Sequence, residues 1–353
     1  MKKNNWVAPL SEGYLLSPAA DWLCAGGLSF TVYLIFLAIP SQVLASINPN
    51  VVKAATFLAF IGNWPHFAAT NYRLYSRKEN IYKFPLTALA IPLLTLAGII
   101  MALYDADGFG RWFVKVFLIW SPYHYSGQTY GLCLMYGMRT GFSIEARLKR
   151  LIWLFIYSSY LYYVSKTENS EMQSNFEGVY FPKFALPFWL PKIFLIVWCV
   201  LGISVLVSLL LHIRKNKKPI PLLMLLPIMT QVLWFGFGSL NSALLFFILV
   251  PFFHSLQYLY VAGATQIRAS RHFSKTNTFY RWVTLNVIGG VGLFWVLPKL
   301  ALVSGLIENI AHPIIVASIN MHHFFVDGVV WKLRDPRLKS LSPVERIQGE
   351  EFK

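Results

Sequence analysis

Six of the eight histidines lie in apolar stretches of the chain, where an imidazole is costly unless it has a partner. They are His66, His124, His254, His312, His322 and His323. Imidazole nitrogens bind iron, zinc and copper, and open positions on such a site suit oxygen chemistry. The three cysteines, by contrast, lie in apolar runs without a CxxC pair, so they do not indicate a thiolate site. The histidine pattern therefore indicates a metal centre.

We predict His66, His124, His254 and His323 as the ligands, with His322 as a fifth candidate. Asp327 follows His323 by one helical turn and is either a ligand or a residue that orients one. It can equally pair with a basic residue such as Arg334. His312 precedes His323 by about 16 Å along a helix, so we expect it in a separate environment.

Hydrogen-bonding residues accompany these histidines at helical spacing. Metal-bound imidazoles usually need such partners, which fix the ring orientation. The predicted supporting residues are Asn63, Gln128, Gln257, Tyr258 and Asn320, with Thr70 on the same face as Asn63 and His66. An alternative is that these polar groups only satisfy one another between membrane helices.

The elements that carry the histidines are predicted membrane helices. The chain is 56% hydrophobic and 13% charged, with a mean hydropathy of +0.52, whereas soluble domains average about 25% charged residues. About 20 apolar residues cross a bilayer. Ten spans follow, at residues 22–46, 51–72, 84–104, 112–138, 150–165, 187–211, 219–238, 242–265, 282–303 and 310–331. We predict an all-α, polytopic transmembrane helical bundle that forms one integral-membrane domain over residues 1–353.

Basic residues orient this bundle. With both termini in the cytoplasm, 24 of the 31 lysines and arginines fall on the cytoplasmic side, as the positive-inside rule expects. The net charge of +16 then reflects loops that face anionic lipid, and nucleic acid is not required as a partner. The candidate ligands fall in the second, fourth, eighth and tenth spans, which all run in one direction. His212 and His272 lie in basic loops, where we expect them to be solvated.

Three known families offer comparisons for a membrane histidine centre. Integral-membrane di-iron desaturases carry HxxxH and HxxHH boxes, which this sequence lacks. His254 with Tyr258, and the His322–His323 pair, echo pieces of the haem–copper oxidases, but the HxH-type haem pair is absent. Isolated histidines on many spans are similar in plan to the Brp/Blh-type carotene dioxygenases, and this resemblance implies a single iron.

Four longer strings resemble a family of uncharacterised bacterial polytopic membrane proteins. They are "NWPHFAATNYRLYS", "WSPYHYSGQTYGLCLMYG", "HSLQYLYVA" and "HHFFVDGVVWKLRD". The resemblance would cover most of the chain. It implies a fold and a bacterial cytoplasmic membrane, but no established activity.

We therefore expect an O2-dependent oxidase or oxygenase that acts on a hydrophobic lipid, isoprenoid or carotenoid. Iron is the expected metal, with haem, copper and zinc as alternatives. One alternative function is a transporter whose histidines bind substrate or tie helices together. Another is a b-haem protein in which two histidines, such as His124 and His254, ligate one iron. The sequence identifies no catalytic residue.

Overall fold

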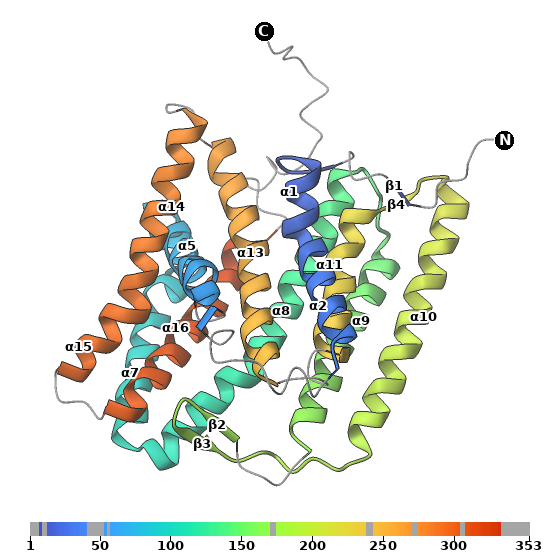
Figure 1. Ribbon diagram of the computed structural model, residues 1–353. Helices are drawn as coiled ribbons and strands as arrows, with labels where there is room; N and C mark the ends of the chain where they lie inside the picture. Colours follow the sequence, from blue (N-terminus) through green and yellow to red (C-terminus); the bar gives the residue numbers. More distant parts are fainter. Residues whose placement is uncertain are drawn as a thin grey trace.

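The computed structural model describes residues 7–8, 13–40, 53–54, 57–169, 174–237, 243–269, 274–303 and 308–332, and this part of the chain is mostly helical (Figure 1). The helices of the first half are α1 (Pro18–Trp22), α2 (Leu28–Ala38), α5 (Trp64–Tyr75), α6 (Lys78–Lys83), α7 (Ile91–Tyr104), α8 (Arg111–Arg139) and α9 (Ala146–Thr167). Those of the second half are α10 (Leu190–Asn216), α11 (Leu222–Val232), α13 (Ala243–Ala269), α14 (Lys275–Val291), α15 (Leu297–Val303) and α16 (Glu308–Val330).

Short strands connect some of these helices. Strands β2 (Ser174–Phe176) and β3 (Val179–Phe181) pair antiparallel as a hairpin between α9 and α10. Strand β1 (Val7–Ala8) pairs in parallel with β4 (Ile220–Pro221) just before α11. The strands are too short to form a core, so the fold is a helical bundle.

A helix in the described residues overlaps each of the ten intervals that the sequence predicts as spans. Five helical segments are long and apolar enough to cross a membrane: Pro18–Ala38, Leu86–Tyr104, Leu190–Asn216, Thr276–Ala301 and Ile310–Val330. The fold class is therefore confirmed as a mostly helical protein with candidate membrane spans. The count of ten spans and the side on which the termini lie stay predictions.

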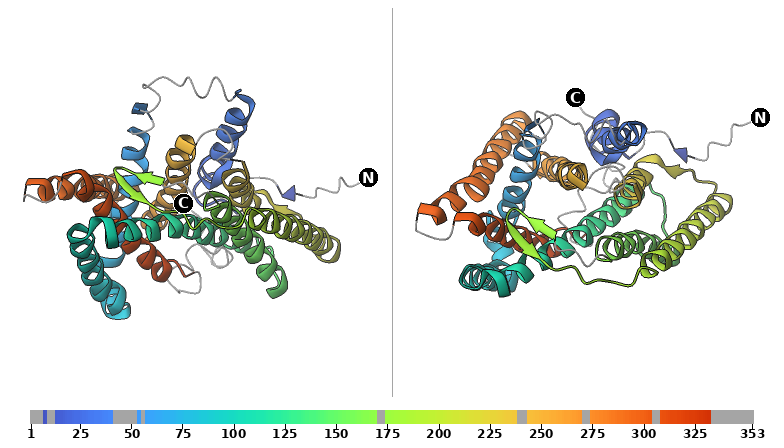
Figure 2. Two further views of the ribbon diagram at one scale, coloured as in Figure 1. Left: turned by 90° about the horizontal axis from the view of Figure 1, so that it is seen from below. Right: turned by 60° about the horizontal axis from the view of Figure 1, so that its bottom comes forward.

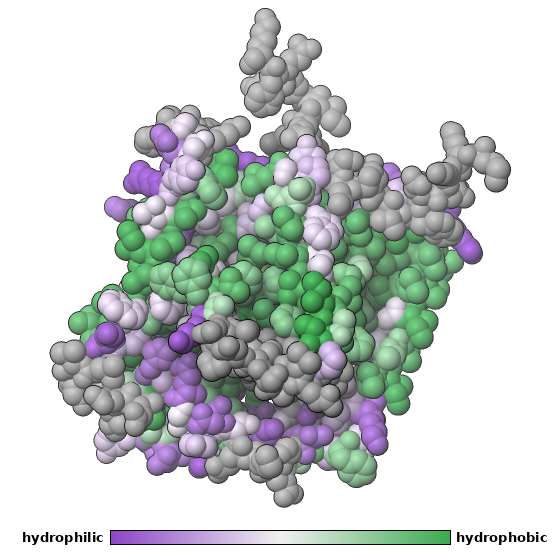
Figure 3. Space-filling view, viewed as in Figure 1, coloured by the Kyte–Doolittle hydropathy of each residue, from purple (hydrophilic) through white to green (hydrophobic). Residues whose placement is uncertain are grey.

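The surface has the polarity of a membrane protein. Hydrophobic side chains form a band across the middle of the visible face, and hydrophilic ones gather toward its two ends (Figure 3). Large apolar side chains such as Leu93 and Ile196 are 67% and 63% exposed. Water would penalise so large an apolar surface, whereas lipid covers it without cost.

Helices α5, α8, α13 and α16 occupy the middle of the bundle (Figures 1 and 2). Helices α9, α10 and α11 lie to one side of them, and α7, α14 and α15 lie to the other. The central four carry the predicted ligands. Their position lets polar side chains face protein on most sides, which lowers the cost of placing them at membrane depth.

A sharp bend joins α1 to α2 and depends on a glycine. The five residues Leu23–Gly27 form a π-helical turn in which Gly26 has φ = +145°. A Cβ at Gly26 would lie 2.4 Å from the Thr230 hydroxyl oxygen, so only glycine fits here. The bend also leaves the Ala25 carbonyl free to accept a hydrogen bond from Gln257 on α13, at 3.1 Å.

Each end of the bundle contains a buried charged group that holds neighbouring segments together. At one end, the Asp21 carboxylate is buried and accepts hydrogen bonds from the backbone N–H groups of Leu15 and Leu16, at 2.6 and 3.1 Å. At the hairpin end, Lys115 on α8 forms an ion pair with Glu168, just after α9. Each charge therefore has a partner, as burial requires.

Candidate metal centre

Four histidine rings from four helices meet in the middle of the bundle. They are His66 on α5, His124 on α8, His254 on α13 and His323 on α16. The ring centroid of His66 lies 4.3 Å from that of His323 and 5.1 Å from that of His254. The centroid of His124 lies 4.8 Å from that of His323 and 5.0 Å from that of His254. The structure thus brings together the four histidines chosen from the sequence.

Prolines lie just before three of these histidines. Pro65 lies in the first turn of α5, which directly follows a π-helical turn (Ala59–Asn63), while Pro122 and Pro251 lie inside α8 and α13. A proline removes one hydrogen bond of the helix and bends it. On α8 the Ser126 hydroxyl donates to the Pro122 carbonyl at 2.9 Å. The three prolines therefore lie within one helical turn of the histidines that follow them.

The ligand atoms form two overlapping groups. One contains His66, His254 and His323, and the other contains His124, His323 and Asp327; within each group one atom per residue lies within 4.8 Å of the others. Two ligands of a single ion at about 2.1 Å are at most about 4.2 Å apart. Three atoms up to 4.8 Å apart lie at most about 2.8 Å from a common centre, so shifts of up to about 0.7 Å each would bring either group onto one ion. His323 belongs to both groups.

Asp327 contributes one carboxylate oxygen to the cluster. Its Oδ2 lies 3.3 Å from His323 Nε2 and 3.7 Å from His124 Nε2, and these two nitrogens are 3.1 Å apart. Its Oδ1 accepts a hydrogen bond from the Thr70 hydroxyl at 3.1 Å. The carboxylate is therefore held between α5 and the imidazoles. The alternative partner, Arg334, lies outside the described residues.

Ser255 orients His66, and sequence reasoning did not identify it. Its hydroxyl donates to Asn63 Oδ1 at 2.8 Å, and its oxygen lies 2.9 Å from His66 Nδ1. Since the hydroxyl proton is directed at Asn63, the oxygen accepts from His66 Nδ1–H. This arrangement leaves the lone pair on His66 Nε2 facing the cluster. Asn63 thus supports His66 as predicted from their spacing, but it does so through a serine on α13.

Several ring nitrogens in the cluster have no hydrogen-bond partner among the described residues. They are His66 Nε2, both nitrogens of His254, and His323 Nδ1. The exposed fractions of His66, His254 and His323 are only 1%, 2% and 0%, so these side chains are buried. An unpaired buried polar atom costs about 1–3 kcal/mol. Four such atoms in one place indicate a site built for a ligand.

The two glutamines support the helices and not the rings. Gln128 donates to the backbone carbonyl of His254 at 2.9 Å and to Gln257 Oε1 at 3.0 Å. Gln257 in turn donates to Ala25. These bonds join α8, α13 and the π-helical turn Leu23–Gly27. The two glutamines therefore fit the alternative in which polar groups satisfy one another between helices. They fix the depth of His254 relative to His124.

Of the remaining predicted supporting residues, Tyr258 contacts a histidine of the cluster and Asn320 bonds to its own helix. The Tyr258 hydroxyl lies 2.7 Å from that of Thr70, and its ring centroid lies 4.4 Å from that of His66. Asn320 donates to the Val316 carbonyl of its own helix at 2.8 Å, so it supports no histidine through the hydrogen bonds of the described residues. An amide one turn after a carbonyl can satisfy itself locally, and spacing alone does not reveal this.

The other histidines lie apart from the cluster. His322 faces α5, where its Nε2 lies 3.4 Å from the Tyr75 hydroxyl. His312 pairs with Glu177 of the β2–β3 turn at 2.7 Å. It is not a member of either ligand group, but it lines the same cavity as His66, His254 and His323. The expectation that His212 is solvated is wrong: it is buried at the end of α10, because Asn216 and the Phe142 ring pack against it. His272 lies outside the described residues.

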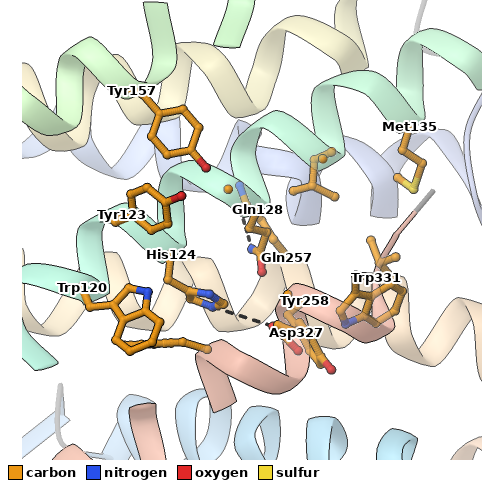
Figure 4. A pocket seen from close by; sticks show the side chains of 16 residues that line it. Trp120, Tyr123, His124, Gln128, Met135, Tyr157, Gln257, Tyr258, Asp327 and Trp331 are labelled. Atoms are coloured by element: carbon orange, nitrogen blue, oxygen red, sulfur yellow. Dashed lines mark hydrogen bonds and ion pairs between the residues drawn. The ribbon is translucent and has the colours of Figure 1, made fainter. Parts of the chain in front are cut away.

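Two cavities flank the cluster. The hairpin cavity, of about 490 Å³, is lined by His66, His254 and His323 together with residues near the β2–β3 turn. The glycine cavity, of about 330 Å³, is lined by His124, Asp327, Gly127, Gly131 and Gly328 among others. His124 and Asp327 face each other on the wall of the glycine cavity (Figure 4). An ion in the cluster would therefore have accessible space on both sides.

Comparison with protein-family models, with curated proteins and with solved structures finds no match for this chain. The two resemblances drawn from its motifs stay predictions. The function must therefore be inferred from the chemistry of the histidine cluster.

Proposed function

We propose that this chain is an integral-membrane metalloprotein whose ligands are His66, His124, His254, His323 and Asp327. The unpaired buried nitrogens of three of these histidines carry the proposal. In lipid, each such atom destabilises the fold unless something binds it. A metal cation would bind these lone pairs, and the carboxylate of Asp327 would offset part of its charge.

The donor set favours iron and oxygen chemistry. Imidazoles with one carboxylate, when positions on the metal stay open, are typical of non-haem iron sites that react with O2. The two cavities provide space at such open positions. We propose an O2-dependent oxidation of a hydrophobic substrate, in keeping with a cluster surrounded by membrane helices. The proposed location is the cytoplasmic membrane of a bacterium, with the basic loops inside.

The ring spacing disfavours the b-haem alternative. Axial imidazoles on opposite faces of one haem iron have centroids about 6 Å apart, with the porphyrin between them. The centroids of His124 and His254 are 5.0 Å apart, and His323 packs against His124 at 4.8 Å. A porphyrin would have to separate these rings. Copper and zinc fit the same donors as iron, so elemental analysis must identify the metal.

The first prediction concerns metal content. Purified protein should contain at least one equivalent of a transition metal, and His323→Ala should lose most of it because His323 belongs to both ligand groups. His322→Ala is the matched control, since its ring faces Tyr75 and not the cluster. Mass spectrometry of the elements, with an absorption spectrum for haem, measures both variants.

A metal-free wild-type protein, or equal metal content in the two variants, would overturn the proposal. The transporter alternative would then gain support from one observation: cavities lie on both sides of the histidine cluster. Substrate sites of transporters lie near the membrane midplane between such spaces. In that case the histidines would bind the cargo directly.

A further inference from the structure

The glycine cavity has an elongated shape that the metal proposal does not explain. Its lining follows one face of α8 from Trp120 through His124, Gln128 and Leu132 to Met135. These residues span about 22 Å of helix at 1.5 Å per residue. The hydrocarbon layer of one membrane leaflet is about 15 Å deep. The cavity is thus long enough for an extended chain of a membrane lipid.

Glycines keep this cavity open. Gly127 and Gly131 lie one turn apart on α8, and Gly328 lies on α16. A Cβ at Gly131 or Gly328 would meet no atom within 4 Å, and one at Gly127 would meet only the Tyr157 hydroxyl, at 3.4 Å. Side chains at these positions would therefore fill the cavity without clashing with its walls. Close packing is the rule between helices, so three such gaps on one cavity leave room for a ligand.

The walls and the opening suit a hydrocarbon. Aromatic rings of Trp120, Tyr123, Phe324 and Trp331 surround the cavity, and Leu132, Met135 and Val261 line it. The polar side chains Gln128 and Gln257 have their amide N–H groups bonded to protein acceptors. Tyr123 and Gly328 line the cavity and are exposed on the surface of the protein, so the cavity opens to the outside. We expect lipid to cover this surface. A lipid chain can therefore enter without crossing water.

We propose that the glycine cavity binds one long hydrocarbon chain in an extended conformation, with a carbon of that chain held beside His124 and Asp327. This inference rests on the proposed function, because it names the substrate of that metal centre. Figure 4 shows His124 between Trp120 and Asp327, while Met135 and Trp331 lie at the end away from Trp120. The apolar remainder of the chain lies along Gly131 toward Met135.

Photolabelling in lipid vesicles tests the inference. One arm uses a diazirine-bearing palmitic acid and the other a diazirine-bearing geranylgeraniol, because acyl and isoprenoid chains share this chemistry. At least one probe should label the α8 peptide that contains Gly127–Met135. The probe that labels more strongly identifies the source of the chain.

Gly131→Leu and Gly328→Leu should each reduce this labelling by at least about tenfold, since an added side chain fills the space that the ligand needs. Gly292→Leu is the matched control: its Cβ also meets nothing within 4 Å, but it lies outside the glycine cavity. Absence of labelling by both probes, or equal labelling in the cavity and control variants, would overturn the inference.

Metal content of the same preparations separates the two proposals. A protein that retains its metal without photolabelling the cavity would overturn the hydrocarbon site alone. A protein that is labelled but lacks metal would overturn the metal centre and leave the hydrocarbon site standing.

Discussion

His323 joins the two ligand groups because of its position on α16. Its Nε2 lies beside His124 and Asp327, whereas its Nδ1 has no partner among the described residues. The neighbouring His322 points about 100° away around the helix and contacts Tyr75. Adjacent histidines thus have separate surroundings, and only one of them faces the cluster.

The second prediction concerns Ser255. Ser255→Ala should weaken metal affinity by about 10- to 100-fold, the usual effect of removing a group that orients a ligand. The reason is that His66 Nδ1 would lose its acceptor, and its ring could turn. Competition with a chelator measures the affinity. Ser255→Thr keeps the hydroxyl and should restore it.

Ser204→Ala is the control for that experiment, because among the described residues the Ser204 hydroxyl bonds only to the Val200 carbonyl within α10. Its metal affinity should equal that of the wild type. If Ser255→Ala behaves like Ser204→Ala, the hydrogen bond from His66 does not orient a ligand.

Spacing on a helix predicted some of these residues and not others. His66 and Asn63 share a face of one helix, so their proximity follows from a period of 3.6 residues. Ser255 directly follows His254 and points elsewhere, so its contact with His66 depends on how α13 packs against α5. No periodicity within one helix encodes that packing. Asn320 shows the converse, since correct spacing did not prevent a bond to its own helix.

At the scale of elements, one bend and a series of amide hydrogen bonds hold two of the histidine-bearing helices together. The π-helical turn Leu23–Gly27 presents the Ala25 carbonyl to Gln257, which bonds to Gln128. This series of amides fixes α8 against α13. Glycine and proline occur in several apolar runs of the sequence, and membrane helices tolerate both residues. The sequence therefore did not show at which position a helix would bend.

The third prediction tests the bend at Gly26. Gly26→Ala should destabilise the protein by about 1–3 kcal/mol, because alanine avoids φ near +145° and its Cβ would collide with the Thr230 hydroxyl. Unfolding in mixed micelles of increasing sodium dodecyl sulfate content measures the free energy. Gly292→Ala, at a position where φ is −56° and ψ is −47° and open space surrounds the residue, should instead leave stability unchanged or raise it by up to about 1 kcal/mol. Equal effects of the two substitutions would contradict a special role for Gly26.

At the scale of the whole molecule, a buried ion pair closes the hairpin end of the bundle. The side chains of Lys115 and Glu168 are 2% and 8% exposed. Lys115 also donates to the Pro182 carbonyl at 3.0 Å, and Glu168 accepts from the Phe184 N–H at 3.0 Å. The pair therefore links α8, the end of α9 and the segment after β3.

The fourth prediction concerns this ion pair. Lys115→Met should destabilise the protein by about 3–5 kcal/mol, because it leaves a buried carboxylate without a counter-charge. The double variant Lys115→Met/Glu168→Met should recover much of that loss, since apolar side chains can replace a buried pair. Unfolding in sodium dodecyl sulfate again provides the measurement. A single variant as stable as the wild type would show that Glu168 finds another partner.

The fifth prediction concerns the side of the membrane that each end of the bundle faces. The distribution of basic residues predicts this orientation, and the fold alone does not determine it. The basic end of α10 and the β2–β3 hairpin lie at opposite ends of that helix, so labels placed there report opposite sides of the membrane (Figure 1). In a variant whose native cysteines are replaced by serine, Tyr180→Cys should react with an impermeant maleimide in intact cells, because Tyr180 is 64% exposed on the hairpin. Arg214→Cys should react only after the membrane is permeabilised, since the positive-inside rule places that basic segment in the cytoplasm. The reverse pattern would invert the bundle and place the glycine cavity's Met135 end nearer the outer face.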